Sequence, residues 1–415
     1  MISGCARDKD ELSFAVGGAP NEVEYWEKLL GDFESQHHIS VTLLRQPTDT
    51  DQRRQMLVIP LKAGEKDPDV FLLDVAWVAQ FSSSRWLFPL DSSIQGDGFD
   101  TGNIFQGVLN QVDRSSEGII ALPVYLDCGI LYYRKDLLEK YGYEVPETWD
   151  RLVEIAQRIQ KEERKNHPSF YGFVWQGAQY EGLVCNFLEF ITAAGGGMEK
   201  KEDAGLLSLD REENIKALGF MRDLIHEIQI SPPNTFTEMK EEEVRIFFQE
   251  QSALFERNWP YAWSLHAGED SAVRGKVGTA VLPRFEGGRH AAALGGWHIG
   301  ISRFSDQKEQ AWELVKFILS LEVQKRLALD LGWNPGRKDL YEDGDLRGRM
   351  PHLGTLKKAL DHAVARPSLP YYTALSTILQ RHIHNVVAGN TEPREGLVKA
   401  QNEIEKSMRV YEQGY

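Results

Sequence analysis

The amino-terminal part of the chain alternates between strand and helix patterns, and no other feature constrains the fold as strongly. Apolar side chains alternate along residues 12–16 and then recur at helical spacing along residues 23–33. A second strand pattern at 39–44 and a helix pattern around 53–56 lead to the apolar run 69–74, which ends in an acid. Strands that are separated by helices in this way predict a parallel α/β sheet.

Three polar residues fall just past the carboxyl ends of these predicted strands. Asn21 and Glu22 follow the turn after the first strand, and Asp74 closes the strand at 69–74. Open α/β sheets bind their ligands at this edge. We therefore expect Glu22 and Asp74 to contribute to a binding site. The alternative for each is to cap the helix that follows it.

The segment 121–149 combines two strand patterns with polar groups in the middle of the first. The first apolar run passes Tyr125 and Asp127, and a second strand follows at 130–133. A helix begins behind Thr148, with apolar residues at helical spacing. A crossing strand with an aromatic and an acid at its centre places polar groups where two domains meet.

The length of 415 residues predicts more than one domain, because a single hydrophobic core seldom grows that large. The acidic run 238–243 predicts an exposed helix start. Strand patterns at 275–282 and 295–301 precede a long helix pattern at 311–327. The tail from 351 to 411 predicts three or four helices.

The charge and the cysteine content exclude several classes of protein. A net charge of −15 argues against nucleic-acid binding, which needs clustered Lys and Arg. No apolar run in the sequence reaches the length of a membrane span. Three cysteines cannot form a disulfide framework, and the His pairs at 37–38 and 382–384 lack a third ligand at metal spacing. We therefore expect neither a metal nor another cofactor, and we expect Cys128 and Cys185 to be buried as small apolar residues.

Several short motifs occur in order along the chain, among them Arg257-Asn-Trp-Pro-Tyr261. They cover residues 14–26, 48–54, 67–71, 121–149, 257–261, 294–300, 332–337 and 366–367. Together they resemble the extracellular solute-binding proteins, family 1, that serve ABC transporters for sugars. Within that family the chain is similar to trehalose/maltose-binding proteins of thermophilic prokaryotes.

The resemblance implies an α/β fold of the type II periplasmic-binding-protein class, in which two α/β lobes are joined by a multi-crossing hinge. The implied division assigns residues 11–125 and 282–328 to lobe one, 128–278 and 333–415 to lobe two, 125–128, 279–283 and 329–332 to the hinges, and 1–10 to a terminal tether.

The resemblance also implies the residues of a sugar site in the cleft between the lobes. A sugar ring has apolar C–H faces and a rim of hydroxyls, so its site needs flat aromatic plates together with charged hydrogen-bonding groups. The residues implied as partners of the hydroxyls are Glu22, Arg53, Asp74, Asp127 and Arg366. Those implied as stacking plates are Tyr125, Trp259, Tyr261 and Trp297, and the backbone of Gly295 and Gly296 is implied to approach the ligand.

Several of these residues also have a plain structural interpretation. Trp259 and Trp297 could belong to the core, although their Gly- and Pro-flanked settings favour exposure in a loop or turn. Either Arg53 or its neighbour Arg54 faces the cleft. Without the resemblance, Arg366 would be interpreted as a surface charge.

These inferences lead to a binding protein and not to an enzyme. The expected function is to bind a disaccharide, trehalose or maltose, and to deliver it to the membrane permease subunits of an ABC importer. The alternatives are binding of another α-glucoside or oligosaccharide, and a glycoside hydrolase that uses Asp74 and Asp127 as its carboxylate pair. The sequence contains no nucleophile elbow, zinc helix motif, phosphate-cradling glycine loop or dinucleotide fingerprint.

The first residues carry a signal for location. Residues 2–5, Ile-Ser-Gly-Cys, resemble the end of a bacterial lipobox, in which the cysteine is lipidated after signal cleavage. This resemblance implies an extracytoplasmic protein, at the cell surface or in the periplasm, that is anchored to the membrane through Cys5. The alternative is that Cys5 is only a terminal residue. We expect the protein to act as a monomer.

Overall fold

The computed structural model describes residues 11–18, 20–47, 49–198 and 208–413. Backbone contacts divide the chain into two compact units. Unit 1 takes the described residues of Met1–Leu126, Gly295–Arg349 and Ser368–Pro370, and unit 2 takes those of Asp127–Leu294, Met350–Pro367 and Tyr371–Tyr415. Cys5 and the predicted tether 1–10 lie outside the described residues.

Unit 1 is built around a mostly parallel sheet. β1 (Glu11–Gly17) pairs in parallel with β2 (Ser40–Gln46) and with β3 (Val70–Asp74). β3 in turn pairs antiparallel with the second half of β11 (Ala292–Ile301). The parallel α/β sheet predicted for the amino-terminal segment is confirmed.

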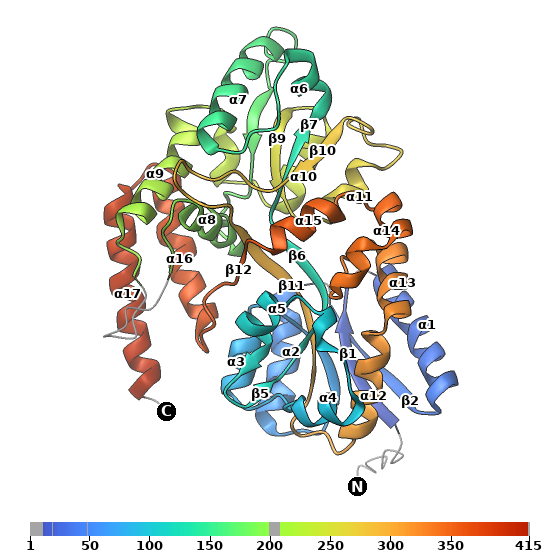
Figure 1. The fold of residues 1–415 in the computed structure, drawn as a ribbon. Helices are drawn as coiled ribbons and strands as arrows, with labels where there is room; N and C mark the ends of the chain where they lie inside the picture. Colours follow the sequence, from blue (N-terminus) through green and yellow to red (C-terminus); the bar gives the residue numbers. More distant parts are fainter. Residues whose placement is uncertain (1–10, 19, 48, 199–207, 414–415) are drawn as a thin grey trace. The chain divides into compact units, whose positions relative to one another are not determined.

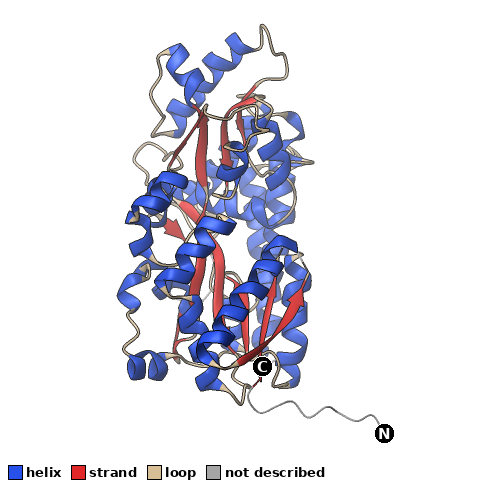
Figure 2. Cartoon of the chain, turned by 90° about the vertical axis from the view of Figure 1, so that its right-hand side faces the viewer, coloured by secondary structure: helices blue, strands red, loops and turns tan. Residues whose placement is uncertain are grey.

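Helices flank this sheet (Figure 1, Figure 2). The other elements of unit 1 are α1 (Pro20–His37), α2 (Thr50–Ala63), α3 (Val78–Ser83), α4 (Asp91–Asp97), η1 (Thr101–Asn103), α5 (Gln106–Val108), η2 (Leu109–Asp113), β4 (Arg114–Ser115), β5 (Gly118–Ile119), α12 (Lys308–Ile318), α13 (Leu321–Leu331), η4 (Lys338–Glu342) and α14 (Gly344–Arg349).

The ends of α2 are fixed by local capping. The Asp49 carboxylate accepts a hydrogen bond from the Gln52 N–H at 2.8 Å, which satisfies an orphan donor of the first turn. Gly64 ends the helix in the left-handed conformation, at φ 71°. This start of α2 places Arg53 in its first turn.

The long helix predicted at 311–327 is wrong, because the structure has two helices there. α12 ends at Ile318, and Ser320 caps α13 by accepting a hydrogen bond from the Val323 N–H at 3.3 Å. Both helices turn apolar residues toward the same core, so the apolar pattern continues across the break.

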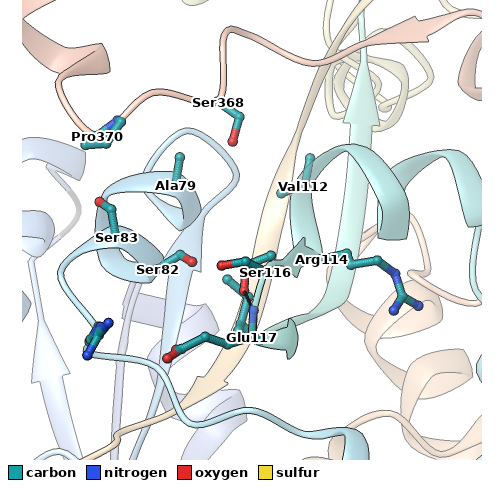
Figure 3. A pocket seen from close by; sticks show the side chains of 12 residues that line it. Ala79, Ser82, Ser83, Val112, Arg114, Ser116, Glu117, Ser368 and Pro370 are labelled. Carbon is teal, nitrogen blue, oxygen red and sulfur yellow. Dashed lines mark hydrogen bonds between the residues drawn. The ribbon is translucent and has the colours of Figure 1, made fainter.

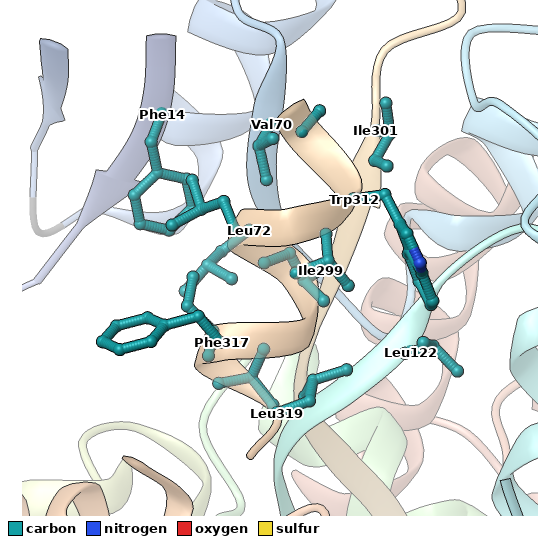
Figure 4. Packing of buried hydrophobic residues seen from close by; sticks show 14 of the residues in the cluster. Phe14, Val70, Leu72, Leu122, Ile299, Ile301, Trp312, Phe317 and Leu319 are labelled. Carbon is teal, nitrogen blue, oxygen red and sulfur yellow. The ribbon is translucent and has the colours of Figure 1, made fainter. Parts of the chain in front are cut away.

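The core of unit 1 lies between the sheet, α1 and α12. Figure 4 shows Phe14 and Leu72 from β1 and β3 packed beside Ile299 of β11, with Trp312 and Phe317 contributed by α12. All of them are buried. This packed core gives the strand ends of unit 1 a rigid support.

Unit 2 contains a smaller mixed sheet in the order β10-β7-β9-β8, in which β8 and β9 are parallel and the other pairs antiparallel. Its elements are β7 (Ile130–Arg134), α6 (Lys135–Tyr141), α7 (Trp149–Glu163), β8 (Tyr171–Val174), α8 (Glu181–Ala193), α9 (Glu212–His226), η3 (Pro233–Phe236), α10 (Glu241–Gln249), β9 (Ala253–Asn258), α11 (Ala262–His266), β10 (Val277–Ala280), α15 (Leu353–Leu360), β12 (Ala363–Val364), α16 (Tyr372–Val387) and α17 (Pro393–Gln413).

Two long strands carry the chain from one unit to the other. β6 (Leu122–Cys128) crosses after Leu126, and β11 crosses after Leu294. The predicted lobes differ from the units at 282–294, which belong to unit 2, and at 333–349 and 368–370, which belong to unit 1. One reason is that β11 is continuous, so the crossing lies inside a strand. The other is that the chain after α13 pairs with unit 1, where the Leu126 N–H donates to the Asn334 carbonyl at 3.0 Å.

Candidate ligand-binding site

The middle of β11 carries the first aromatic residue of the site. Trp297 lies opposite Asp74 in the β3–β11 pair, and its indole is half-buried. The rings of Trp77 and Trp297 form a T-shaped pair, with centroids 5.3 Å apart. The strand predicted at 295–301 is confirmed, because Trp297 lies within β11. The loop or turn inferred from the flanking glycines is wrong, since Gly295 and Gly296 are also residues of that strand.

Arg53 covers the Trp297 indole. Its guanidinium carbon lies 4.6 Å from the ring centroid, and its Nε donates a hydrogen bond to the Pro47 carbonyl at 2.7 Å. Arg54 points elsewhere and donates to Gln80 Oε1 at 3.3 Å. Of the two arginines, Arg53 is therefore the one that meets the predicted site residues.

Charges gather around Arg53. Burial lowers the pKa of the Arg53 guanidinium. Tyr125, Glu22 and Asp74 oppose this shift in the pKa of Arg53, which means that they lie within electrostatic reach of its charge. Five of the predicted residues thus meet in unit 1: Glu22, Arg53, Asp74, Tyr125 and Trp297.

Trp333 joins this group, although it was not predicted as a site residue. Its Nε1–H donates to Glu22 Oε1 at 3.0 Å, and its ring centroid lies 4.3 Å from that of Tyr125. The signal in the sequence is the run Gly332-Trp-Asn-Pro335, in which a tryptophan directly follows a helix end. Glu22 therefore orients an aromatic ring of the site.

Gly296 is required by the backbone beside it. Its φ is +126°, and a Cβ there would lie 2.4 Å from the Tyr125 carbonyl oxygen. Its own carbonyl accepts a hydrogen bond from the Val75 N–H at 3.1 Å. The glycine allows β11 to pass close to Tyr125, so it holds two of the predicted aromatic residues near each other.

Unit 2 carries the other predicted aromatic residues just after β9. Trp259 Nε1–H donates to Glu241 Oε1 at 3.4 Å, and the Tyr261 hydroxyl donates to Glu242 Oε1 at 2.6 Å. Burial, followed by the hydrogen bond to Glu242, raises the pKa of Tyr261. The acidic start of α10, which was predicted only as an exposed helix start, therefore orients both rings.

Arg366 is a buried residue of unit 2 and not a surface charge. Its side chain is 8% exposed, and Nη1 donates to Glu181 Oε1 at 3.0 Å. Tyr372 and Ser376 of α16 also donate to the Glu181 carboxylate. Glu181 was missed by the sequence analysis, because its partners lie more than 180 residues away in the chain.

Asp127 is half-buried where β6 enters unit 2. Burial, followed by the charge of Asp127, raises the pKa of the Cys128 thiol. Cys128 and Cys185 are buried free cysteines, as predicted. Asp127, Trp259, Tyr261 and Arg366 thus all belong to unit 2.

A separate hollow in unit 1 has a different chemistry. It has a volume of about 340 Å³ and lies between α3, the β4–β5 hairpin and residues 368–370. Figure 3 shows the hydroxyls of Ser82, Ser116 and Ser368 among its lining side chains. Its lining contains no aromatic residue and none of the predicted site residues, so it lacks the plates that a pyranose ring needs.

Neither a metal site nor a membrane span is found in the described part of the chain. No three or more His, Cys, Asp or Glu side chains there form a group that could hold a metal ion. Among the described helices, none combines the length and apolar character of a bilayer span.

Comparison with known proteins identifies the family of this chain. Residues 19–325 match the profile of the bacterial extracellular solute-binding proteins. A relative from Deinococcus radiodurans, named a "probable ABC transporter-binding protein", is 33% identical over 386 residues, which are 92% of this chain and 88% of the relative. The chain belongs to the bacterial extracellular solute-binding protein family.

Two further solute-binding proteins resemble this one over most of its length. The structure of T. maritima MalE3 with bound maltose is 40% identical, covers 95% of this chain and 99% of that chain, and has a TM-score of 0.82. A maltotriose-binding protein of Pyrococcus abyssi is 25% identical and covers 94% of this chain and 81% of its own. The family and the type II periplasmic-binding-protein fold predicted from the sequence are both confirmed.

Proposed function

We propose that this solute-binding protein binds a disaccharide, maltose or trehalose, between its two units and delivers it to the permease subunits of an ABC importer. The observation that carries the proposal is the group around Arg53 in unit 1. A guanidinium, carboxylates and flat indoles meet there, which are the groups that a ring with apolar faces and a hydroxyl rim requires.

Each half of the proposed site supplies both kinds of contact. In unit 1, Trp297 provides a ring and Asp74 a carboxylate, and in unit 2, Trp259 provides a ring and Arg366 a guanidinium. Hydrogen bonds to charged groups contribute about 1.5–3 kcal/mol each, so a few of them suffice for strong binding. The maltose bound to the 40% identical T. maritima protein supports a glucose disaccharide as the ligand.

The proposal also concerns which sugar the protein prefers. The relative from P. abyssi, named for maltotriose, favours a longer α-glucoside as the second candidate. Isothermal titration calorimetry against maltose, trehalose, maltotriose and glucose tests the choice directly. We expect tight binding of maltose or trehalose, and binding of none of the four would overturn the proposal.

A binding role without catalysis is part of the same proposal. The relatives described above are named as binding proteins, which supports transport over glycoside hydrolysis by Asp74 and Asp127. Prolonged incubation with each disaccharide, followed by an assay for released glucose, separates the two roles. A binding protein returns the disaccharide intact, whereas steady release of glucose would show hydrolysis.

We further propose that the protein acts as an extracytoplasmic monomer, with Cys5 as its lipid-bearing residue. Its net charge of −15 supports a partner other than nucleic acid. Labelling of cells with a palmitate analogue, with Cys5→Ser as the control variant, tests the anchor. Equal labelling of both proteins would contradict it.

A further inference from the structure

A buried ion pair lies directly behind Trp259. Arg257 in β9 and Glu189 in α8 are 1% and 2% exposed. Arg257 Nε donates to Glu189 Oε2 at 2.9 Å, and Nη2 donates to Glu189 Oε1, so the pair is bidentate. Arg257 Nη1 donates to Gln176 Oε1 at 3.2 Å. These bonds fix the plane of the guanidinium.

The same guanidinium covers one face of the Trp259 indole. Its central carbon lies 4.3 Å from the ring centroid, which is the geometry of a cation–π contact. A sugar ring can therefore stack only on the opposite face. The indole Nε1–H also donates to Glu241 Oε1, but at 3.4 Å this bond is long and leaves the tilt of the ring less constrained.

The backbone next to the ion pair leaves room for it and donates a hydrogen bond to it. A Cβ at Gly129 would lie 2.0 Å from Glu189 Oε1 and 2.5 Å from Arg257 Nη2, so a glycine is needed there to leave room for the pair. Glu189 Oε1 also accepts the Ala293 N–H of β11 at 3.0 Å. The pair is thus held between β9, the first residues of β11 and α8.

Stability alone does not explain such a pair. Two buried charges often contribute no more stability than apolar residues of the same volume, because both must be removed from water. A rigid planar cation can, however, fix the orientation of an aromatic ring, which apolar side chains do less well.

We propose that Arg257, held by Glu189, is a positioning residue that fixes the sugar-stacking face of Trp259. The proposal rests on the sugar-binding function proposed above. Arg257 acts through Trp259 and does not itself touch the sugar, since the indole lies over its guanidinium.

A mutant cycle tests this inference. The first variant is Arg257→Met with Glu189→Gln, which removes both charges together and keeps an acceptor for the Ala293 N–H. It is compared with Trp259→Ala and with the triple variant that combines all three substitutions. The matched control is Arg134→Met with Asp136→Asn, a second bidentate pair of unit 2 with a buried arginine and no contact to Trp259.

The paired variant should weaken disaccharide binding about tenfold, the size of a good cation–π contact. Because Arg257 acts through the indole, the triple variant should bind no more weakly than Trp259→Ala alone. The control pair should keep wild-type affinity. Wild-type affinity in the paired variant, or a loss that adds to that of Trp259→Ala, would overturn the inference.

A second measurement needs no sugar. The near-ultraviolet circular dichroism of Trp259, obtained by subtracting the spectrum of Trp259→Ala, should decrease in the paired variant and persist in the control pair. An unchanged contribution would overturn the positioning role, even if no sugar in the panel binds the wild-type protein. If the paired variant does not fold, Arg257→Lys replaces it, and wild-type affinity with an unchanged spectrum would overturn the inference equally.

Discussion

The guanidinium of Arg53 lies 4.6 Å from the centroid of the Trp297 indole and joins residues that are 244 positions apart in the chain. Arg53 comes from the first turn of α2, and Trp297 comes from the middle of β11. The Arg53 guanidinium covers part of the Trp297 ring, and Asp74 of β3 lies opposite Trp297 in the strand pair. Removal of either side chain should therefore affect binding more than folding.

Trp297→Ala should weaken disaccharide binding at least tenfold, because it removes a proposed stacking plate and the ring beneath Arg53. The indole is half-buried, so the loss of stability should be smaller than the roughly 3–5 kcal/mol of a fully buried aromatic residue. Calorimetry and the melting temperature without ligand measure the two effects. Trp312→Ala, in the core of the same unit, is the control and should show the reverse. A collapsed melting temperature with normal affinity in Trp297→Ala would assign that indole to the core.

Trp333→Phe should weaken binding through Glu22. The substitution keeps an aromatic ring beside Tyr125 but removes the Nε1–H that holds the Glu22 carboxylate at 3.0 Å. Loss of one hydrogen bond to a charged group predicts a decrease in affinity of about tenfold. Trp312→Phe is a matched control, because its Nε1–H also donates to a carboxylate, that of Asp97, at 2.9 Å. Equal affinities of the two variants would show that the orientation of Glu22 does not matter.

His352 should make the protein less stable in acid. Burial lowers the pKa of His352 to about 3, whereas a histidine of the unfolded chain has a pKa of about 6.5. Between these values the unfolded state binds a proton that the folded state does not, so the free energy of unfolding falls as the pH decreases. In His352→Gln this contribution is absent. Urea unfolding at pH 7 and pH 5 should therefore show a smaller loss for the variant, and equal losses would contradict the assignment.

A sugar that touches residues of both units should favour an arrangement in which the units approach each other. The radius of gyration from small-angle scattering should then fall on addition of saturating disaccharide. A sugar that calorimetry shows not to bind serves as the control and should leave the profile unchanged. An unchanged profile with the bound disaccharide would argue that the ligand contacts one unit only.

The sequence predicted some boundaries well and others poorly. The strand–helix alternation in the described residues from 11 to 74 was predicted correctly, because apolar spacing reports which face of each element is buried. The helix start behind Thr148 was also correct, since Thr148 accepts the Arg151 N–H and caps α7. The break at Ser320 was missed, because both α12 and α13 pack on one core and the apolar pattern runs across the cap.

In the proposed site, individual residues could be chosen from local sequence, but their contacts with residues distant in the chain could not. Trp259 and Trp297 could be singled out from residue type and neighbours in the chain. The residues that hold these two indoles in place could not be assigned from the sequence. Trp259 is held by Arg257 with Glu189, and Trp297 is covered by Arg53. The Arg257–Glu189 and Arg53–Trp297 contacts join elements far apart in the chain. Charged residues look alike in a sequence whether they are solvated or buried in pairs.

By itself, the sequence determined the class of fold and the chemical types available to the site, because hydrophobic periodicity and residue type are local properties of the chain. Only the tertiary structure decided that Arg53 and not Arg54 meets Trp297, and that Glu189 pairs with Arg257. These outcomes depend on which surfaces come together when the strands pair and the helices pack. Such pairing is set by the fit of the whole core, and no local pattern contains it.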